Sequence, residues 1–184
     1  MANVVLWTIV GVLAVVVLYV IITFNSLIMF RNRVNNAWSQ IDVQLKRRYD
    51  LIPNLINTVK GYMKHEKGVL TEVTRLRAKL VSGTMSEKSK ASDAISNALK
   101  TIFAVSERYP KLQASENFKM LQEELAGTES KIAFSRQFYN DNVMVLNNKI
   151  QQFPSSVVAR ILNFKDREFF KTAETEKKAV KVEF

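Results

Sequence analysis

Apolar side chains follow two different patterns along this chain. Residues 4–22 (VVLWTIVGVLAVVVLYVII) are apolar on every side of a helix, interrupted only by Thr8 and Gly11. As a helix this run is about 28 Å long, close to the ~30 Å hydrocarbon core of a bilayer. From Val34 onward, apolar residues recur every three or four positions, which is typical of helices that bury one face. The pattern predicts one transmembrane helix followed by a helical domain.

A cleaved signal peptide is the alternative interpretation of the first segment. It fits poorly, because no basic residue precedes the run and no A-x-A cleavage site follows it. We therefore expect residues 1–24 to be a retained transmembrane helix that spans the bilayer between Val4 and Ile22. Trp7 and Tyr19 are expected near the two membrane interfaces.

Four amphipathic helical segments are predicted after the span. Neither glycine nor proline separates the first from the span, so the two should form one continuous helix. The segments cover residues 27–52, 53–81, 87–109 and 115–152. Because the last two connections are short, we expect an all-α fold in which residues 25–171 form an antiparallel up-and-down four-helix bundle with long helices. A long coiled coil is the alternative. Residues 172–184 are expected to be a mobile charged tail.

Pro53 lies between the first two of these segments. Proline lacks an amide hydrogen and clashes with the preceding turn, which costs roughly 3 kcal/mol inside a helix. At the first turn of a new helix the missing hydrogen costs nothing. We therefore favour a hairpin in which Pro53 starts the second helix. The alternative is a bend within one helix of more than about 50 residues.

The composition excludes several kinds of active site. The chain has no cysteine and a single histidine, His65. The sequence HEKGV lacks the second histidine of a metalloprotease H-E-x-x-H motif, with Val69 in its place. No phosphate-binding glycine loop and no G-x-S-x-G motif is present. We therefore expect neither enzymatic activity nor a bound cofactor or metal.

The charge distribution predicts orientation and partners. The net charge of +10 belongs entirely to the residues after position 30. Arg31 and Arg33 directly follow the span, so the positive-inside rule places the N-terminus outside and the domain in the cytoplasm. Basic residues are spread over all segments without a nucleic-acid-binding module, so we expect attraction to the lipid bilayer and no nucleic-acid partner.

Charged residues also occur at or beside positions of the apolar seams. If they are buried they must be paired, and they would then fix helix register more than add stability. Alternatively, the seams are wide enough for edge residues to reach solvent. The candidates for this buried polar layer are Arg48, Glu66, Glu107, Glu129 and Arg136. Arg48 and Glu107 are expected at similar heights in an up-and-down bundle.

The segment of residues 153–171 (FPSSVVARILNFKDREFFK) mixes aromatic, aliphatic and basic residues. Such segments lie in membrane interfaces, and the fourth helix should return toward the membrane. The alternative is that the segment covers the base of the bundle. The candidate membrane-surface residues are Phe153, Arg160, Ile161, Phe164, Phe169 and Phe170.

Two long stretches, RNRVNNAWSQIDVQLKRRYDLIPNLINTVKGYMKHEKGVLTEVTRLRA and ERYPKLQASENFKMLQEELAGTESKIAFSRQFYNDNVMVLNNKIQQFPSSVVA, closely resemble the two halves of the LemA family. The resemblance covers about residues 25–170, with Asn163 where the family usually has glycine. It implies a bacterial single-pass inner-membrane protein with its N-terminus outside, a cytoplasmic bundle of bromodomain-like topology, and no enzymatic activity.

Two functions remain as alternatives. The first is a membrane scaffold that forms a homo-oligomer larger than a dimer and organises or remodels the bilayer. The second is an adaptor or regulator of a membrane metalloprotease in envelope stress or quality control, a link that the family resemblance implies. A large assembly would favour the scaffold, and a monomer or dimer that co-purifies with a protease would favour the adaptor.

Overall fold

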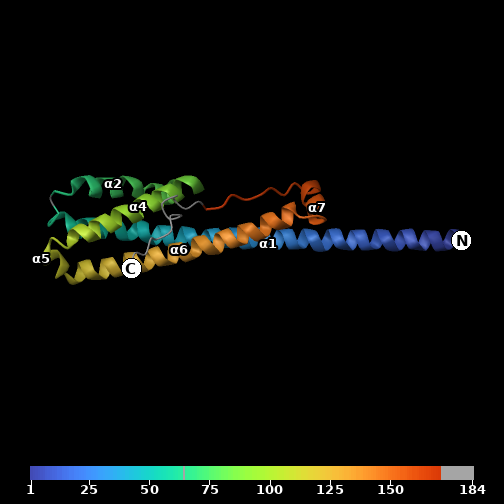
Figure 1. Cartoon of the computed structure of the whole chain (residues 1–184), viewed down its shortest axis with the longest axis horizontal. Coiled ribbons are helices and arrows are strands. Elements are labelled where there is room, and N and C mark those ends of the chain that lie inside the picture. The colour runs from blue at the N-terminus through green and yellow to red at the C-terminus, as the bar shows by residue number, and fades with distance from the viewer. Residues whose placement is uncertain (64, 171–184) are drawn as a thin grey trace, which may run out of the picture. The chain divides into compact units, whose positions relative to one another are not determined.

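The computed structural model describes residues 1–63 and 65–170, and these residues contain helices and no strand (Figure 1). The tail predicted for residues 172–184 lies outside them. The elements are α1 (Ala2–Lys60), α2 (Lys67–Arg77), α3 (Lys79–Ser82), α4 (Met85–Ser106), α5 (Pro110–Gln113), α6 (Glu116–Gln151) and α7 (Ser155–Ile161). The all-α prediction is confirmed, and the antiparallel four-helix topology stays a prediction.

Two compact units divide the described chain. The first, here called the N-terminal unit, contains residues 1–38 and 138–169. The second, here called the central unit, contains residues 39–137 together with Phe170. Both α1 and α6 contribute to each unit, and the units are described separately.

Helix α1 is continuous from the apolar segment into the amphipathic one, as predicted. It also continues through Pro53, so the predicted hairpin is wrong. The predicted second helix is correspondingly wrong in its bounds, because α1 ends at Lys60 and α2 begins at Lys67.

A contact from α2 explains why the helix tolerates Pro53. Because proline has no amide hydrogen, the carbonyl of Tyr49, one turn earlier, loses its helical donor. Arg77 replaces that donor, since its Nε donates to the Tyr49 carbonyl oxygen at 2.8 Å. The Arg77 guanidinium also lies 3.7 Å from the centroid of the Tyr49 ring. A side chain 28 positions away in sequence therefore satisfies the carbonyl that the proline leaves unpaired.

The central unit buries the apolar stripe that the spacing predicted. In α1 this stripe includes Ile41, Leu45, Ile52, Leu55 and Val59, all fully buried. Helix α4 packs against α2 and α3. Its start is fixed by a capping box, in which the Thr84 hydroxyl accepts from the amide of Glu87 and the Glu87 carboxylate accepts from the amide of Thr84.

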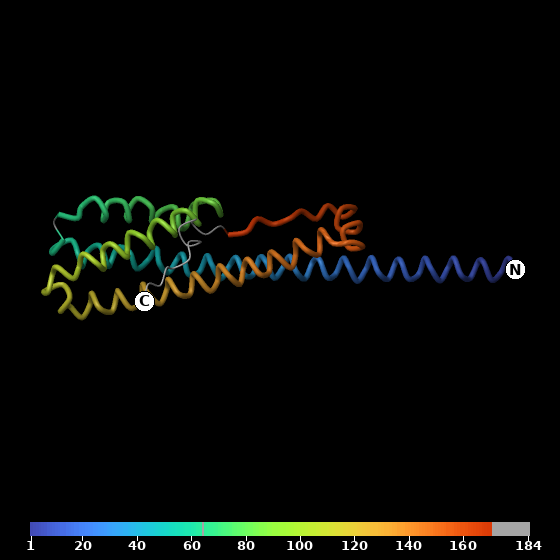
Figure 2. Tube along the Cα trace, viewed as in Figure 1, coloured from blue at the N-terminus to red at the C-terminus, as the bar shows by residue number. Residues whose placement is uncertain are grey.

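The N-terminal unit pairs the first part of α1 with the end of α6. The Trp38 and Tyr139 rings meet edge to face, with centroids 5.6 Å apart. After α7 and a turn at Leu162 and Asn163, residues 164–169 form an extended segment, here called the strap, which runs back along α6 (Figure 2). The Tyr139 hydroxyl donates to the Glu168 carbonyl oxygen at 3.0 Å. The Asn147 amide binds both the N–H and the C=O of Arg167, each at 2.9 Å.

The turn from α7 into the strap is made by Asn163, which has a φ of 56°. This is the left-handed region, which asparagine tolerates better than other non-glycine residues. The turn expected of a glycine is therefore formed here by Asn163. It lets the strap reverse direction, so that Gln151 at the end of α6 donates to the Asp166 carboxylate at 2.9 Å.

Candidate functional site

A buried polar cluster joins three helices of the central unit. Arg48 of α1 is fully buried, and its Nη1 donates to the carbonyl oxygen of Ser92 at 3.2 Å and to the hydroxyl of Ser96 at 3.1 Å. Its other Nη atom forms an ion pair with Glu129 of α6. The Ser96 hydroxyl donates to the same carboxylate at 2.8 Å, so Ser96 links the cation and the anion.

A second ion pair lies near the first. Arg136 of α6 is buried, and its Nη2 lies 2.7 Å from the carboxylate of Asp93 in α4. The same guanidinium lies 4.6 Å from the centroid of the Phe170 ring, which is 2% exposed. The last described residue of the chain is thus held on Arg136 by apolar and cation–π contact.

The cluster is electrically balanced, with two guanidinium groups and two carboxylates. Burial, with a smaller contribution from Arg136, lowers the pKa of Arg48 to about 10, and Asp93 acts in the opposite direction. The guanidinium therefore keeps its charge at neutral pH. The Nε atoms of Arg48 and Arg136 have no hydrogen-bond acceptor among the described residues. The arrangement resembles a register-fixing polar core more than a reactive centre.

The predicted polar-layer residues do not all meet. Arg48, Glu129 and Arg136 lie in the central unit as described, with Glu129 half-exposed. Glu107 is exposed at the end of α4, so its assignment to a buried layer at the height of Arg48 is wrong. Glu66 is also outside the cluster: it is half-buried just before α2 and accepts a hydrogen bond from the Tyr109 hydroxyl at 3.2 Å.

Sequence reasoning missed Asp93, Ser92 and Ser96. A signal was present, since two serines four positions apart interrupt the face of α4 that also carries Ile95 and Leu99. Small polar residues at that spacing make room for a large side chain from a neighbouring helix. Among the described residues, no group of three or more His, Asp or Glu side chains could hold a metal ion.

The apolar segment of α1 is exposed along its whole length. Val4, Trp7 and Ile22 have exposed side chains, and Tyr19 is 37% exposed. Within the described residues, α1 is the one helix long and apolar enough to cross a membrane. Arg31 and Arg33, the predicted topology charges, are both exposed.

The predicted membrane-surface segment divides into exposed and buried residues. Phe153 and Ile161 are 84% and 77% exposed, and Arg160 and Phe169 are exposed as well. Phe164 instead packs edge to face on Phe24 of α1, with centroids 6.4 Å apart. Phe170 is buried against Arg136, so its assignment to a membrane surface is wrong.

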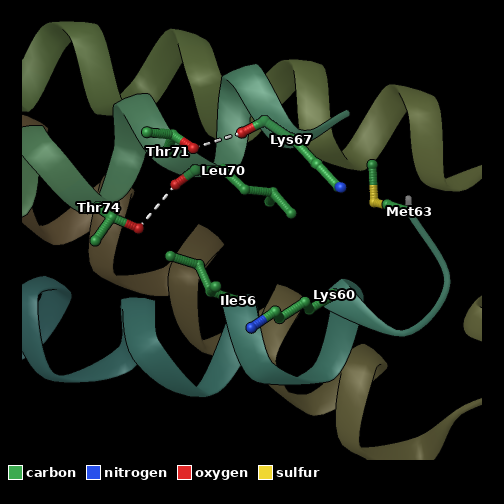
Figure 3. A pocket seen from close by; sticks show the side chains of 7 residues that line it. All are labelled: Ile56, Lys60, Met63, Lys67, Leu70, Thr71 and Thr74. Atoms are coloured by element: carbon green, nitrogen blue, oxygen red, sulfur yellow. Dashed lines mark hydrogen bonds between the residues drawn. The ribbon is translucent and has the colours of Figure 1, made fainter. Parts of the chain in front are cut away.

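A cavity of about 490 Å³ lies between the end of α1 and α2 (Figure 3). Its apolar residues are Ile56, Met63 and Leu70, and the ammonium groups of Lys60 and Lys67 carry its charge. The Thr71 and Thr74 hydroxyls donate to carbonyl groups of their own helix at 2.8 Å. Because its hydroxyls are engaged and none of the described residues that line it is a carboxylate, these residues form no acid–base or nucleophilic pair.

A groove on the surface of the central unit has a different character. Val43 of α1 and Phe134 of α6 line it and are 62% and 69% exposed. The groove has a volume of about 390 Å³, and Lys131 lies at its edge. The Oε1 atom of Gln44, which also lines it, is buried and accepts no hydrogen bond from the described residues. The groove therefore combines exposed apolar surface with an unsatisfied acceptor.

The known proteins that this chain resembles carry two kinds of name, LemA and magnetosome protein MamQ. The family model described as LemA family matches residues 37–184. Protein LemA of Metamycoplasma hominis is 28% identical over 158 residues, which cover 83% of this chain and 71% of that protein. Magnetosome protein MamQ 2 of Paramagnetospirillum magneticum and magnetosome protein MamQ of Magnetospirillum gryphiswaldense are 23% and 22% identical over 174 residues. Those matches cover 80% of this chain and 64% of each magnetosome protein, so the chain spans less than two thirds of their length.

Proposed function

Because the chain belongs to the LemA family, we propose that it is a non-enzymatic, membrane-anchored helical scaffold that self-assembles and organises or remodels the bacterial membrane. In this proposal residues 1–24 cross the inner membrane once. The N-terminus lies outside, and the helical domain lies in the cytoplasm. Similarity to proteins named LemA and magnetosome protein MamQ supports membrane association, and none of these names is an enzyme name.

The exposed apolar part of α1 supports the membrane anchor. In water, exposing this much apolar surface would cost about 25 cal/mol for each Å², whereas a lipid environment removes that cost. Orientation rests on Arg31 and Arg33, which follow the apolar segment. Adding lysines before Val4 while neutralising both arginines should invert a fraction of the molecules. A reporter active only in the cytoplasm, fused at Phe184, would detect the inversion as lost signal.

The observation that carries self-assembly is the groove lined by Val43 and Phe134. Both side chains are largely exposed in the isolated chain, which is typical of an apolar surface that another protein covers. We assign this groove to a second copy of the chain. Each copy is tethered to the same membrane by one helix, so copies meet at one height and at high effective concentration.

Identical contacts of this kind generate closed rings or open arrays. A groove on one copy that receives a different surface of the next makes a head-to-tail contact. Such contacts produce assemblies larger than a dimer, and an array tied to a bilayer at regular spacing would organise the lipid beneath it.

The test is the particle size of the full-length protein in mild detergent. The wild-type chain should form a homo-oligomer larger than a dimer, and Phe134→Asp should reduce it to monomers and dimers. Met120→Asp is the matched control, because Met120 is an exposed apolar residue of α6 outside the groove. Analytical ultracentrifugation over a wide concentration range measures both variants.

One result would decide against the scaffold, and another against the groove as its contact surface. If the wild-type protein is monomeric at every concentration, self-assembly is excluded and the adaptor function takes its place; co-purification with a membrane metalloprotease would then support that alternative. If Met120→Asp dissociates the assembly as strongly as Phe134→Asp, the groove is not the contact surface.

A further inference from the structure

A second cleft, in the N-terminal unit, is basic. It has a volume of about 410 Å³ and lies between α1 and the strap. Arg31 of α1 lines one side, and the strap residues Phe164, Lys165, Asp166 and Arg167 line the other. We propose that this cleft binds the phosphate-bearing headgroup of an anionic membrane lipid. The proposal rests on the membrane anchor described above and adds a specific ligand to it.

The backbone of the strap is held in place independently of its basic side chains. Asn147 binds the backbone of Arg167 at both its N–H and its C=O. Gln151 fixes Asp166, and the Tyr139 hydroxyl fixes the carbonyl of Glu168. The Lys165 and Arg167 side chains contribute to none of these bonds. The cleft is therefore preorganised, with its cationic groups left for a ligand.

The charges of the cleft are not balanced from within. Arg31, Lys165 and Arg167 carry three positive charges against the single carboxylate of Asp166. None of the ion pairs formed among the described residues involves any of the three cations. By contrast, the buried cations Arg48 and Arg136 are each paired with a carboxylate. A phosphate diester placed between two guanidinium groups and an ammonium would accept charge-assisted hydrogen bonds from all of them.

The position of the cleft along α1 favours a lipid over a soluble phosphate compound. Phe24 follows the end of the predicted span at Ile22 by two residues, about 3 Å along the helix axis. Phe164 contacts Phe24, and the Arg31 guanidinium lies 5.7 Å from the centroid of the same Phe164 ring. The headgroup region on each side of the hydrocarbon core is about 5–7 Å thick. Arg31 itself follows Ile22 by nine residues, about 14 Å along the helix axis. Its guanidinium therefore starts beyond the headgroup region, and the long arginine side chain can reach back toward the lipid headgroups.

Apolar side chains complete the site for an amphiphile. Ile161, at the end of α7, is 77% exposed, and Leu162, in the turn before the strap, is 41% exposed. Phe24 is exposed on the adjoining part of α1. Ile161 and Leu162 directly precede the cleft residues in sequence, and Phe24 contacts Phe164 of the cleft. An acyl chain can therefore cover these side chains while the cations hold the headgroup. A free phosphate ion would leave them uncovered.

The experiment compares lipids on the full-length protein in detergent. Native mass spectrometry counts bound molecules of phosphatidylglycerol, phosphatidylcholine and, as the soluble anion, glycerol phosphate. Phosphatidylglycerol should be retained preferentially by the wild type. The double variant Lys165→Gln/Arg167→Gln should weaken that retention at least about tenfold, because two charged hydrogen-bond donors are lost. Arg33→Gln is the matched control, since Arg33 is an exposed arginine of α1 that does not line the cleft.

Flotation of the full chain with vesicles of phosphatidylcholine alone separates this proposal from the membrane anchor. If the chain floats but retains both lipids equally, the anchor stands and the headgroup site is excluded. If it does not float, both proposals fall. If Arg33→Gln loses as much phosphatidylglycerol as the double variant, the retention depends on the overall positive charge and not on the cleft. Competition by glycerol phosphate as strong as by the lipid would identify a soluble phosphate ligand and overturn the lipid assignment.

Discussion

In the central unit the charged residues Arg48 and Arg136 are inside, and each is paired with a carboxylate from another helix. In the N-terminal unit the arrangement is reversed. Its arginines and lysine at positions 31, 165 and 167 are exposed, and so is the apolar surface of residues 4–22. The same helix, α1, supplies residues to both units.

This contrast reflects two different solvents. A unit surrounded by water can bury an arginine only when partners replace its lost hydration, as Glu129, Ser92 and Ser96 do for Arg48. A unit at a lipid boundary gains by exposing apolar side chains and placing cations next to them. The distribution of apolar and charged side chains therefore distinguishes a water-surrounded part of the chain from a membrane-associated part.

Removing the membrane-associated part should have the largest effect. Deletion of residues 1–24 should abolish flotation with vesicles of phosphatidylcholine alone, because the apolar segment supplies the anchor. The remaining chain should stay helical by circular dichroism, since the core of the central unit lies entirely after residue 38. It should also be mostly monomeric in ultracentrifugation, because the tether no longer concentrates it. Vesicle binding of the truncated chain equal to that of the full chain would contradict the assignment of the anchor.

The next largest effect should come from removing a charge from the interior of the central unit, which should lower its free energy of unfolding. Glu129→Ala leaves Arg48 buried without its carboxylate, which should lower the free energy of unfolding by about 3 kcal/mol. Urea denaturation of the chain lacking residues 1–24 measures the change. Glu123→Ala, an exposed glutamate on the same helix, should change it by less than about 0.5 kcal/mol. Equal small losses for both variants would show that the cluster adds little to stability.

The contact between Arg77 and the Tyr49 carbonyl can be isolated by a double-mutant cycle. Arg77→Ala should cost about 1–2 kcal/mol, because it leaves that carbonyl without a donor. In the Pro53→Ala background, residue 53 regains an amide hydrogen that can bond the same carbonyl. The cost of Arg77→Ala should then fall by about 1 kcal/mol, which denaturation of the four proteins would measure. Additive costs would mean that Arg77 does not compensate for the proline.

The most local effect is expected at the turn of the N-terminal unit. Asn163→Val should destabilise this turn by about 1–2 kcal/mol, because a β-branched residue is strained at a positive φ. Asn163→Gly should be tolerated within about 0.5 kcal/mol, since glycine adopts this conformation freely. Hydrogen exchange of the strap amides, such as that of Arg167, reports the local change. Equal protection in both variants would indicate that the turn does not hold the strap.

The sequence by itself determined the features that depend on neighbouring residues. The apolar run at residues 4–22 and the three-four spacing after it identified the candidate span and the all-helical chain, because helix periodicity is local. The bounds of α6, Glu116–Gln151, agree with the predicted 115–152 for the same reason. The position at which the first basic residue, Arg31, follows the uncharged N-terminal residues could also be identified from the sequence alone.

Only the tertiary structure decided the features that depend on distant partners. From local propensity Pro53 should end a helix, yet Arg77 supplies the missing donor and α1 continues. The seam pattern identified Arg48 and Arg136 as charged residues to examine, but it also suggested Glu107, which is exposed, and did not identify Asp93. Whether a charge is buried depends on which helix packs against it, and the partners of Arg48 are more than 40 positions away in sequence. The spacing of apolar residues predicts which face of a helix is buried, whereas tertiary packing determines which residues contact that face.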